Sequence, residues 1–303
     1  MTELEQSETQ REGATGYVAL IGRPNTGKST FLNTVLHQHL AAVSSKPQTT
    51  RKHLLGILTD EDSQILFLDT PGIHQAKLAL DAAMDKSILR VLSDADVVVC
   101  LVDPTRKPGA EDALAAERAK SVKKPTVVVL NKCDIATPEQ IAEMEAKYRE
   151  YFPQAPFFQM TALEEASCQP VVSFLKGLLP RGPFLYDEDE LTDVYEREIA
   201  QEFIRETLLE QLRQEVPHCI AVQVDKWQEK EKKISIGATL YIERAGHKAI
   251  VIGKGGERIR QIRLASAEKI HKFCGKFIDL SLFVKLREDW RDNKRFLNEI
   301  GLQ

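Results

Sequence analysis

Glycine, lysine and serine occur at a spacing suited to phosphate binding in GRPNTGKS, residues 22–29. The segment follows an apolar run, opens a helical pattern and satisfies G-x-x-x-x-G-K-[ST]. Backbone N–H groups in such a loop, together with the positive end of the helix, can surround an anionic phosphate chain. We expect Lys28 to reach the outer phosphates and the Ser29 hydroxyl to bind magnesium. The predicted contacts of this loop are Gly22, Arg23, Pro24, Asn25, Thr26, Gly27, Lys28, Ser29 and Thr30.

Two further motifs follow in the order that a guanine nucleotide site requires. LDTPG, residues 68–72, ends an apolar run, so Asp69 can hold magnesium through water and the Gly72 N–H can meet a third phosphate. NKCD, residues 131–134, ends another run, and the Asp134 carboxylate can accept the N1–H and amine of guanine. Adenine offers no such pair of donors, so the motifs predict binding of GTP and GDP and disfavour an ATPase. The predicted contacts are Asp69, Thr70, Pro71, Gly72, Asn131, Lys132 and Asp134.

Strand-like and helical patterns alternate around these motifs. Helical patterns cover residues 28–39, 110–122 and 138–151, between apolar runs at 17–22, 54–59, 64–69, 96–103, 126–131 and 156–160. Several runs are apolar throughout, as in strands covered on both faces. The order predicts an α/β domain with a mostly parallel sheet and helices on both sides.

The composition changes after residue 179, where LPRGPFLYDEDELTD brings two prolines, a glycine and five acids. Such a segment is typical of a linker between domains. A helix over 194–215, two strands, a glycine turn between helices, a last strand and a short helix near 294–300 are expected beyond it. The predicted division is a disordered lead-in at 1–15, a nucleotide domain at 16–180, a linker at 181–193 and a smaller α+β domain at 194–303.

The glycine turn VIGKGGERI, residues 251–259, has the spacing V-I-G-x-x-G-x-x-I. Within the order helix, strand, strand, helix, GxxG, helix, strand it resembles a type II KH domain, in which this loop clamps single-stranded nucleic acid. From residue 244 to 276 there are nine Lys or Arg and two acids, although the whole chain carries a net charge of −4. A one-sided basic cluster beside such a turn favours nucleic acid. The predicted RNA contacts are Ile252, Gly253, Lys254, Gly255, Gly256, Arg258, Ile259 and Arg263.

Residues 17–180 resemble the Ras-like P-loop GTPases. The resemblance implies that PQTTR, residues 47–51, is the first switch, with Thr50, or alternatively Thr49, as a magnesium ligand beside Ser29 and Asp69. It also implies a fifth motif touching guanine, and the corresponding residues here are Thr161, Ala162 and Leu163, without the glycine that usually follows.

Ile73 stands where many Ras-like proteins place a water-orienting glutamine, and Ile73 cannot form a hydrogen bond. We therefore expect slow intrinsic hydrolysis. In GTPases that resemble this one, an asparagine at the position of Asn25 can hold a potassium ion near the phosphates; the alternative is that Asn25 only stabilises the loop. The predicted catalytic set is Asn25, Lys28, Thr50 and Gly72.

Together, the motifs and the domain order resemble the Era family of ribosome-assembly GTPases along nearly the whole chain. The resemblance implies a cytoplasmic GTPase, a monomer, that binds the 3′ end of 16S rRNA, assists maturation of the small (30S) ribosomal subunit and lets the nucleotide gate RNA binding and release. It also implies peripheral contact with the inner face of the plasma membrane. Two other functions stay open: an RNA-binding scaffold whose GTP site scarcely turns over, and a membrane-linked signalling GTPase.

The bulk properties agree with a cytosolic protein of two domains. The chain has 303 residues, 43% hydrophobic and 28% charged, a length suited to two cores. Its five cysteines form no CxxC pair and are expected to be reduced thiols. The polar N-terminus has no apolar signal core, and no stretch approaches membrane-spanning length.

Overall fold

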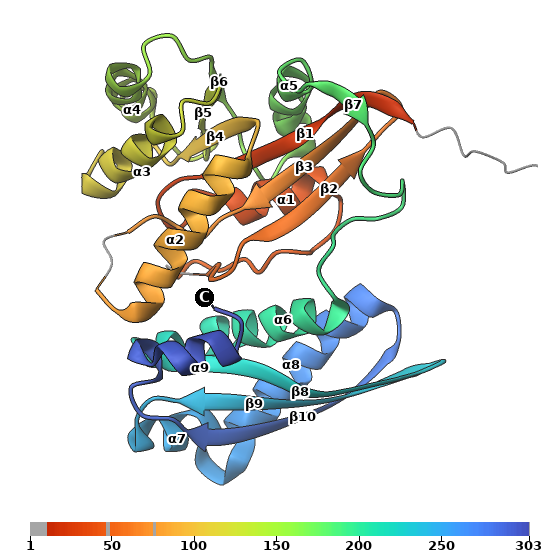
Figure 1. Cartoon of the computed structure of the whole chain (residues 1–303). Helices are drawn as coiled ribbons and strands as arrows, with labels where there is room; N and C mark the ends of the chain where they lie inside the picture. Colours follow the sequence, from red (N-terminus) through yellow and green to blue (C-terminus); the bar gives the residue numbers. More distant parts are fainter. Residues whose placement is uncertain (1–10, 47–48, 75–76, 303) are drawn as a thin grey trace, which may run out of the picture.

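The computed structural model describes residues 11–46, 49–74 and 77–302. Pro47 and Gln48, the first two residues of the predicted switch, lie outside this range. Two domains follow one another along the chain and lie one above the other in Figure 1. Each has its own sheet, and each sheet agrees with the pattern of apolar runs in the sequence.

The N-terminal domain contains a seven-stranded sheet in the order β2-β3-β1-β4-β5-β6, with the short strand β7 paired to β1. Strands β3, β1, β4, β5 and β6 are parallel, while β2 and β7 are antiparallel to their neighbours. The prediction of a mostly parallel sheet is therefore confirmed. The strands are β1 (Glu12–Ile21), β2 (Leu54–Thr59), β3 (Ser63–Asp69), β4 (Val97–Val102), β5 (Thr126–Leu130), β6 (Phe157–Gln159) and β7 (Arg181–Pro183).

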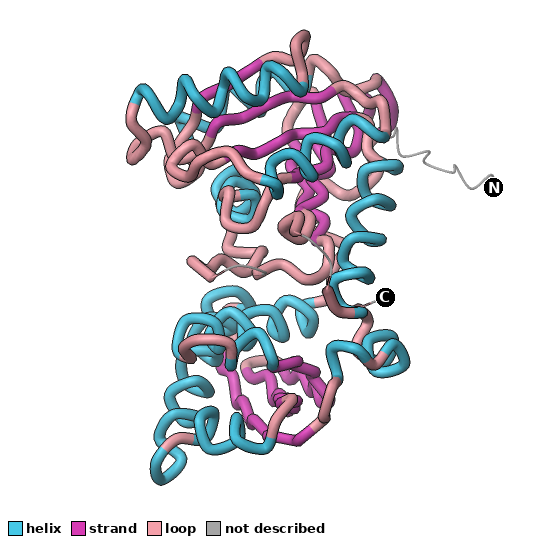
Figure 2. Tube along the Cα trace, turned by 90° about the vertical axis from the view of Figure 1, so that its left-hand side faces the viewer, coloured by secondary structure: helices cyan, strands magenta, loops and turns pink. Residues whose placement is uncertain are grey.

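Helices cover both faces of this sheet (Figure 2). Along β1, Val18 and Leu20 belong to one apolar cluster and Ala19 and Ile21 to another, because successive side chains of a strand point to opposite faces. Helices α1 and α5 contribute to the first cluster, and α2, α3 and α4 to the second. The helices are α1 (Lys28–Val35), α2 (Ala79–Asp94), α3 (Ala110–Ser121), α4 (Pro138–Tyr151) and α5 (Glu165–Lys176).

Three boundaries differ from the sequence-based expectation. Strand β1 begins at Glu12, inside the predicted lead-in, and β7 occupies the start of the predicted linker, because Glu12 pairs with Pro183 and Ala14 with Arg181. The pairing joins segments that are far apart in the chain, which local patterns do not reveal. The first helix ends at Val35 rather than at residue 39, since His37 adopts a left-handed φ of 52°. Helices α2 and α5 were not among the helical patterns identified.

The C-terminal domain has the predicted element order. Its sheet runs β10-β9-β8, with β10 parallel and β8 antiparallel to β9. Helices α6 and α8 pack together against this sheet. The elements are α6 (Glu196–Gln211), the 3₁₀ turn η1 (Val216–Cys219), β8 (Ile220–Lys230), β9 (Lys233–Ile242), α7 (Ala245–Ile252), the turn η2 (Lys254–Gly256), α8 (Glu257–Cys274), β10 (Phe277–Leu286), the turn η3 (Trp290–Asp292) and α9 (Lys294–Glu299).

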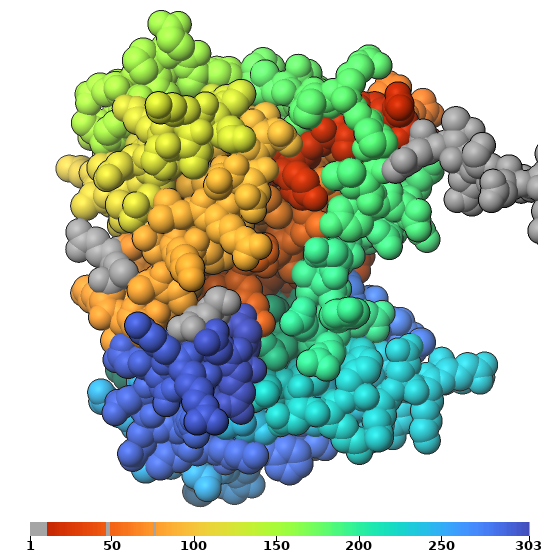
Figure 3. Space-filling model, in the orientation of Figure 1, coloured from red at the N-terminus to blue at the C-terminus, as the bar shows by residue number. Residues whose placement is uncertain are grey.

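The two domains share a small apolar cluster. Leu80 and Met84 of α2 pack with Trp290, Phe296 and Leu297 from η3 and α9. The C-terminal segment, blue in Figure 3, accordingly lies against the orange surface of the upper domain. Among the described residues, no helix is long and apolar enough to cross a bilayer.

Candidate nucleotide and RNA sites

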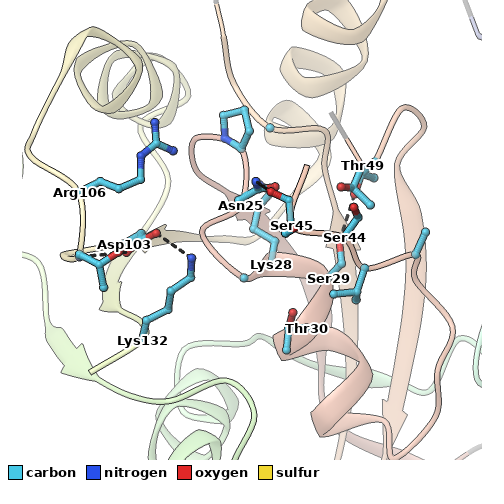
Figure 4. Close-up of a pocket in the computed structure, with 17 residues that line it drawn as sticks. Asn25, Lys28, Ser29, Thr30, Ser44, Ser45, Thr49, Asp103, Arg106 and Lys132 are labelled. Atoms are coloured by element: carbon cyan, nitrogen blue, oxygen red, sulfur yellow. Dashed lines mark hydrogen bonds and ion pairs between the residues drawn. The ribbon is translucent and has the colours of Figure 1, made fainter. Parts of the chain in front are cut away.

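The loop between β1 and α1 borders a cavity of about 430 Å³ (Figure 4). Gly27 has φ 96°, and a Cβ there would lie 2.1 Å from Asn131 Nδ2, so the loop requires glycine at this position. The Lys28 side chain is 5% exposed, with its Nζ 3.4 Å from Gly22 O and 3.3 Å from Arg23 O. Burial lowers the pKa of Lys28 to about 8. A buried cation with only two long hydrogen bonds to carbonyls is suited to receive phosphate oxygens.

Three oxygens from three motifs converge beside Lys28. Ser29 Oγ lies 2.6 Å from Asp69 Oδ2 and 3.1 Å from Thr50 Oγ1, and Thr50 Oγ1 lies 3.4 Å from Asp69 Oδ2. Asp69 is fully buried, which raises its pKa, and its Oδ1 has no hydrogen-bond partner among the described residues. Hydroxyl and carboxylate oxygens are ligands that magnesium prefers, so this set fits the ion. The Thr49 hydroxyl instead donates to Lys46 O at 2.8 Å.

The NKCD segment, the P-loop and the fifth motif are tied together by Asn131. Its Nδ2 donates to Thr26 O at 2.8 Å, and its Oδ1 accepts from Ala162 N at 2.8 Å, so one side chain joins the P-loop to the fifth motif. Asp134 is exposed and accepts from the Thr161 hydroxyl at 3.2 Å. Leu163 is 77% exposed. The structure thus brings the predicted guanine-contacting segments together despite the missing glycine.

The DTPG segment lies against the P-loop. Gly72 is so close that a Cβ there would lie 2.6 Å from Pro24 Cα. The Ile73 N–H donates to Gly22 O at 3.0 Å, and the Ile73 side chain, 1% exposed, belongs to the apolar core. Because this side chain is buried, it leaves the position of the water-orienting glutamine without a polar group.

The Arg23 side chain departs from the prediction. It is 3% exposed and turns away from the cavity, with Nη1 donating to Asp112 Oδ2 at 2.7 Å and Nη2 to Asp103 O at 2.7 Å. The buried Asp112 attracts the guanidinium, so Arg23 anchors the loop to α3 and its side chain does not line the phosphate cavity.

Several cavity residues were not predicted. Asp103 follows β4 and accepts from Lys132 Nζ at 2.8 Å (Figure 4). The position of Asp103 directly after a strand could have identified it, since ligand sites of parallel sheets lie beyond the carboxyl ends of the strands. Ser44 and Ser45 belong to the segment before the first switch, for which the sequence offered no motif. The additional lining residues are Ala42, Val43, Ser44, Ser45, Asp103, Thr105 and Arg106.

In the glycine turn of the C-terminal domain, the glycines adopt the positive φ values that their positions in the sequence predict. Gly253, Gly255 and Gly256 have φ values of 74°, 60° and 81°, a region that favours glycine. Lys254 and Gly255 are exposed at its tip. A cavity of about 700 Å³ lies beside the turn, bordered by Gly253 and Arg258 together with α6 and α7. A glycine turn with an exposed lysine, next to a groove between helices, can approach a nucleic-acid backbone.

A sheet with a P-loop, a cluster of magnesium-type oxygens and an NKxD motif defines a P-loop GTPase, here joined to a KH-type RNA-binding domain. A sequence profile of the family described as 50S ribosome-binding GTPase matches residues 17–132, and a KH domain profile matches residues 215–291. GTPase Era of Lacticaseibacillus paracasei is 39% identical over 291 residues, 96% of this chain and 97% of that protein. The chain belongs to the Era family of GTPases.

Two solved structures of Era are similar to nearly the whole chain. Era bound to MgGDPNP and nucleotides 1506–1542 of 16S ribosomal RNA is similar with a TM-score of 0.91 and 31% identity, covering 96% of this chain and 99% of that one. A variant of Aquifex aeolicus Era bound to GDP·AlF4⁻ gives a TM-score of 0.90 and 31% identity, covering 95% and 99%. The predicted resemblance to Era is therefore confirmed.

Proposed function

We propose that this protein hydrolyses GTP at the cavity beside Lys28 and binds the 3′ end of 16S rRNA through its KH domain, assisting assembly of the small ribosomal subunit. One observation carries the nucleotide part: Ser29, Thr50 and Asp69, from three separate motifs, meet within 3.4 Å of one another beside a buried lysine. Magnesium would be held there by these three residues, and the ion would screen phosphate charge. The RNA part is supported by the Era complex with that rRNA segment.

The chain's own residues account for slow turnover. Lys28 and the loop N–H groups bind and orient the phosphates, and the Gly72 N–H is available to a third phosphate. Because Ile73 is buried in the core, no side chain at that position holds the attacking water. We propose that intrinsic hydrolysis is slow for this reason.

We propose that Asn25 holds potassium. Asn25 has a left-handed φ of 65°, and its Nδ2 donates to Ser45 O at 2.6 Å, so the P-loop amide reaches the segment that precedes the first switch. With the amide reversed, its oxygen and the Ser45 carbonyl could both serve a monovalent cation. Hydrolysis should then be faster in potassium than in sodium, and Asn25→Ala should abolish the difference. Asn298→Ala, exposed on α9, is the control. GDP affinity in sodium tests whether the alanine has collapsed the loop.

The RNA assignment is tested by fluorescence anisotropy with a short RNA ending in the 16S 3′ sequence and a scrambled RNA. Each is measured with GDPNP and with GDP. We expect sequence-dependent binding that weakens in GDP and is lost in Lys254→Glu, while Lys272→Glu, exposed on α8 and paired with Glu268, binds nearly as the native protein does. Equal binding of both RNAs in both nucleotide states would contradict the proposal.

We also propose that the protein acts as a monomer and touches anionic membranes peripherally, through the basic surface of its KH domain. Light scattering after size exclusion tests the first statement, and co-sedimentation with anionic vesicles, with the 16S RNA as competitor, tests the second. Tight vesicle binding without preference among RNAs would instead favour a membrane-linked signalling GTPase.

A further inference from the structure

The KH domain holds the first switch on both sides of Thr50. On one side, Arg205 of α6 donates from Nη2 to the carbonyl oxygen of Thr49. On the other side, the Arg51 side chain enters the KH domain and is 5% exposed. Arg205 itself is 3% exposed and pairs with Glu202 one turn earlier on α6. The peptide carrying Thr50 is therefore attached to the second domain before and after that residue.

Arg51 occupies a site built by three consecutive peptide units. Its Nη2 donates to His218 O at 2.8 Å and its Nη1 to Ile220 O at 2.9 Å, while Trp290 Nε1 donates to the intervening Cys219 O at 3.0 Å. The guanidinium lies 5.4 Å from the centre of the Trp290 ring, within range of a cation–π interaction. The planar fork of arginine directs a separate nitrogen at each of the two carbonyls, whereas a lysine would have to serve both from a single nitrogen.

Leaving this site is costly for the protein. Withdrawal would take the arginine donor from the buried Ile220 carbonyl and the partly buried His218 carbonyl, and would leave a cavity against Trp290, which is fully buried. The first switch and the KH domain are therefore expected to move together.

We infer that the docked KH domain positions Thr50 for the magnesium site, with Arg51 and Arg205 as the positioning residues. Thr50 reaches Ser29 and Asp69 while the flanking peptide is held by the second domain. The inference rests on the proposed role of Thr50 as a magnesium ligand. It makes domain docking a condition for binding the triphosphate, since the third phosphate and its metal order the switches of GTPases.

The contacts of Arg51 and Arg205 should affect the binding of GTP more than the binding of GDP. When only a fraction of molecules holds a binding-competent switch, the apparent dissociation constant rises by the inverse of that fraction. Releasing the switch should weaken a triphosphate analogue with magnesium and leave GDP, held by the P-loop and NKCD, almost unchanged. By linkage, the triphosphate should in turn favour docking of the KH domain.

The test compares the affinities of GDPNP and GDP over a magnesium titration in five forms of the full chain: native, Arg51→Lys, Arg51→Ala, Arg205→Ala and Lys52→Ala. Lys52 is the matched control, because it is the next basic residue and also spans the domains, but its ion pair with Glu198 is 3.9 Å long and partly exposed. We expect GDPNP to bind about tenfold more weakly in the three arginine variants, with a higher magnesium requirement, and GDP to change less than about twofold.

A second readout follows Arg51 directly. The chain has two tryptophans, Trp227 and Trp290, so a Trp227→Phe background leaves Trp290 as the only tryptophan, which can be excited selectively over the tyrosines. Acrylamide quenching of Trp290 should increase in Arg51→Ala and stay unchanged in Lys52→Ala.

A Thr50→Ala variant shows whether a negative result contradicts the positioning inference alone or also the assignment of Thr50 as a magnesium ligand. If Thr50→Ala weakens GDPNP while Arg51→Lys and Arg205→Ala bind GDPNP and GDP as the native chain does, the positioning inference is overturned and the magnesium assignment stands. If Thr50→Ala also leaves GDPNP binding unchanged, the role of Thr50 is wrong and the inference fails with it. Should Arg51→Ala not fold, Arg51→Lys and Arg205→Ala decide the outcome.

Discussion

His74 Nε2 lies 3.0 Å from Asp81 Oδ1, and the other ring nitrogen of His74 lies 3.0 Å from the Gly72 carbonyl oxygen. Both neighbours accept hydrogen bonds, so the doubly protonated imidazolium can satisfy both and the neutral ring only one. The hydrogen bond to Asp81 raises the pKa of His74, with Glu111 on α3 adding to the effect, and the pair holds the pKa of Asp81 at about 2 despite its burial. The histidine thus ties the DTPG segment to the start of α2.

This pair predicts a pH-dependent contribution to stability. The folded-state pKa of His74 lies above its unfolded value of 6.5, so the contribution is complete below pH 6.5 and is lost as pH rises through the folded value. His74→Gln should lower the free energy of unfolding by about 1 kcal/mol at pH 6 and by much less at pH 9. Urea denaturation at both pH values measures this. An equal loss at both would show that the charged form is not responsible.

Nucleotide affinity should decrease above pH 8 because of Lys28. Its pKa of about 8 without ligand must rise when phosphates bind, so binding takes up a proton once Lys28 is partly neutral. We expect the affinity for GDP to fall about fourfold between pH 7 and pH 8.5. Calorimetry in two buffers with different ionisation enthalpies counts the protons. Absence of proton uptake at pH 8.5 would mean that Lys28 stays charged in the empty site.

Base selectivity should depend on Asp134. Asp134→Asn exchanges a carboxylate that accepts two hydrogen bonds for an amide, which suits xanthine better than guanine. Loss of two charge-assisted hydrogen bonds of about 1.5 kcal/mol each corresponds to about a hundredfold weaker GDP binding. Competition between GDP and XDP measures the change, with Asp94→Asn, exposed near the end of α2, as control. Retained guanine preference in Asp134→Asn would remove Asp134 from the base site.

Glu206 should be the most costly acidic residue to alter at the domain boundary. Its Oε1 accepts from Val43 N at 2.8 Å and from His39 at 3.2 Å, and its Oε2 accepts from Lys269 of α8 at 2.8 Å. Burial alone would raise the pKa of Glu206, but the bonds from His39 and Lys269 hold it below its ordinary value. Its contribution is therefore present above the unfolded pKa and lost as pH falls through the folded one.

The matched control for Glu206 is Glu210, which also pairs with Lys269 but is 45% exposed. Glu206→Gln should reduce the free energy of unfolding by about 2 kcal/mol, because the new amide N–H groups face donors in a buried site. Glu210→Gln should cost less than about 1 kcal/mol. Thermal unfolding at pH 7 measures the two changes in the free energy of unfolding. Similar decreases in the two variants would show that the burial of Glu206 does not increase its contribution to stability.

Local chemistry made much of this protein readable from its sequence. The P-loop requires glycine at position 27, because a Cβ there would clash with Asn131. The KH turn requires glycine at three positions with positive φ. Both segments can therefore be recognised in the sequence by their glycines. Apolar runs identified the strands, because a strand that is buried on both faces must carry apolar side chains at nearly every position. Strand β7 escaped detection, since its three residues are specified by pairing with β1 and carry no pattern of their own.

Contacts between distant segments were decided only by the folded chain. The sequence placed two threonines side by side, but the fold turned Thr50 toward Asp69 and Thr49 toward Lys46. Nothing in the sequence around Arg51 predicted that it would donate to carbonyl groups 167 and 169 residues further along the chain. Motifs encode what a backbone must do locally, whereas the partner of a buried charge depends on which surfaces the two domains bring together.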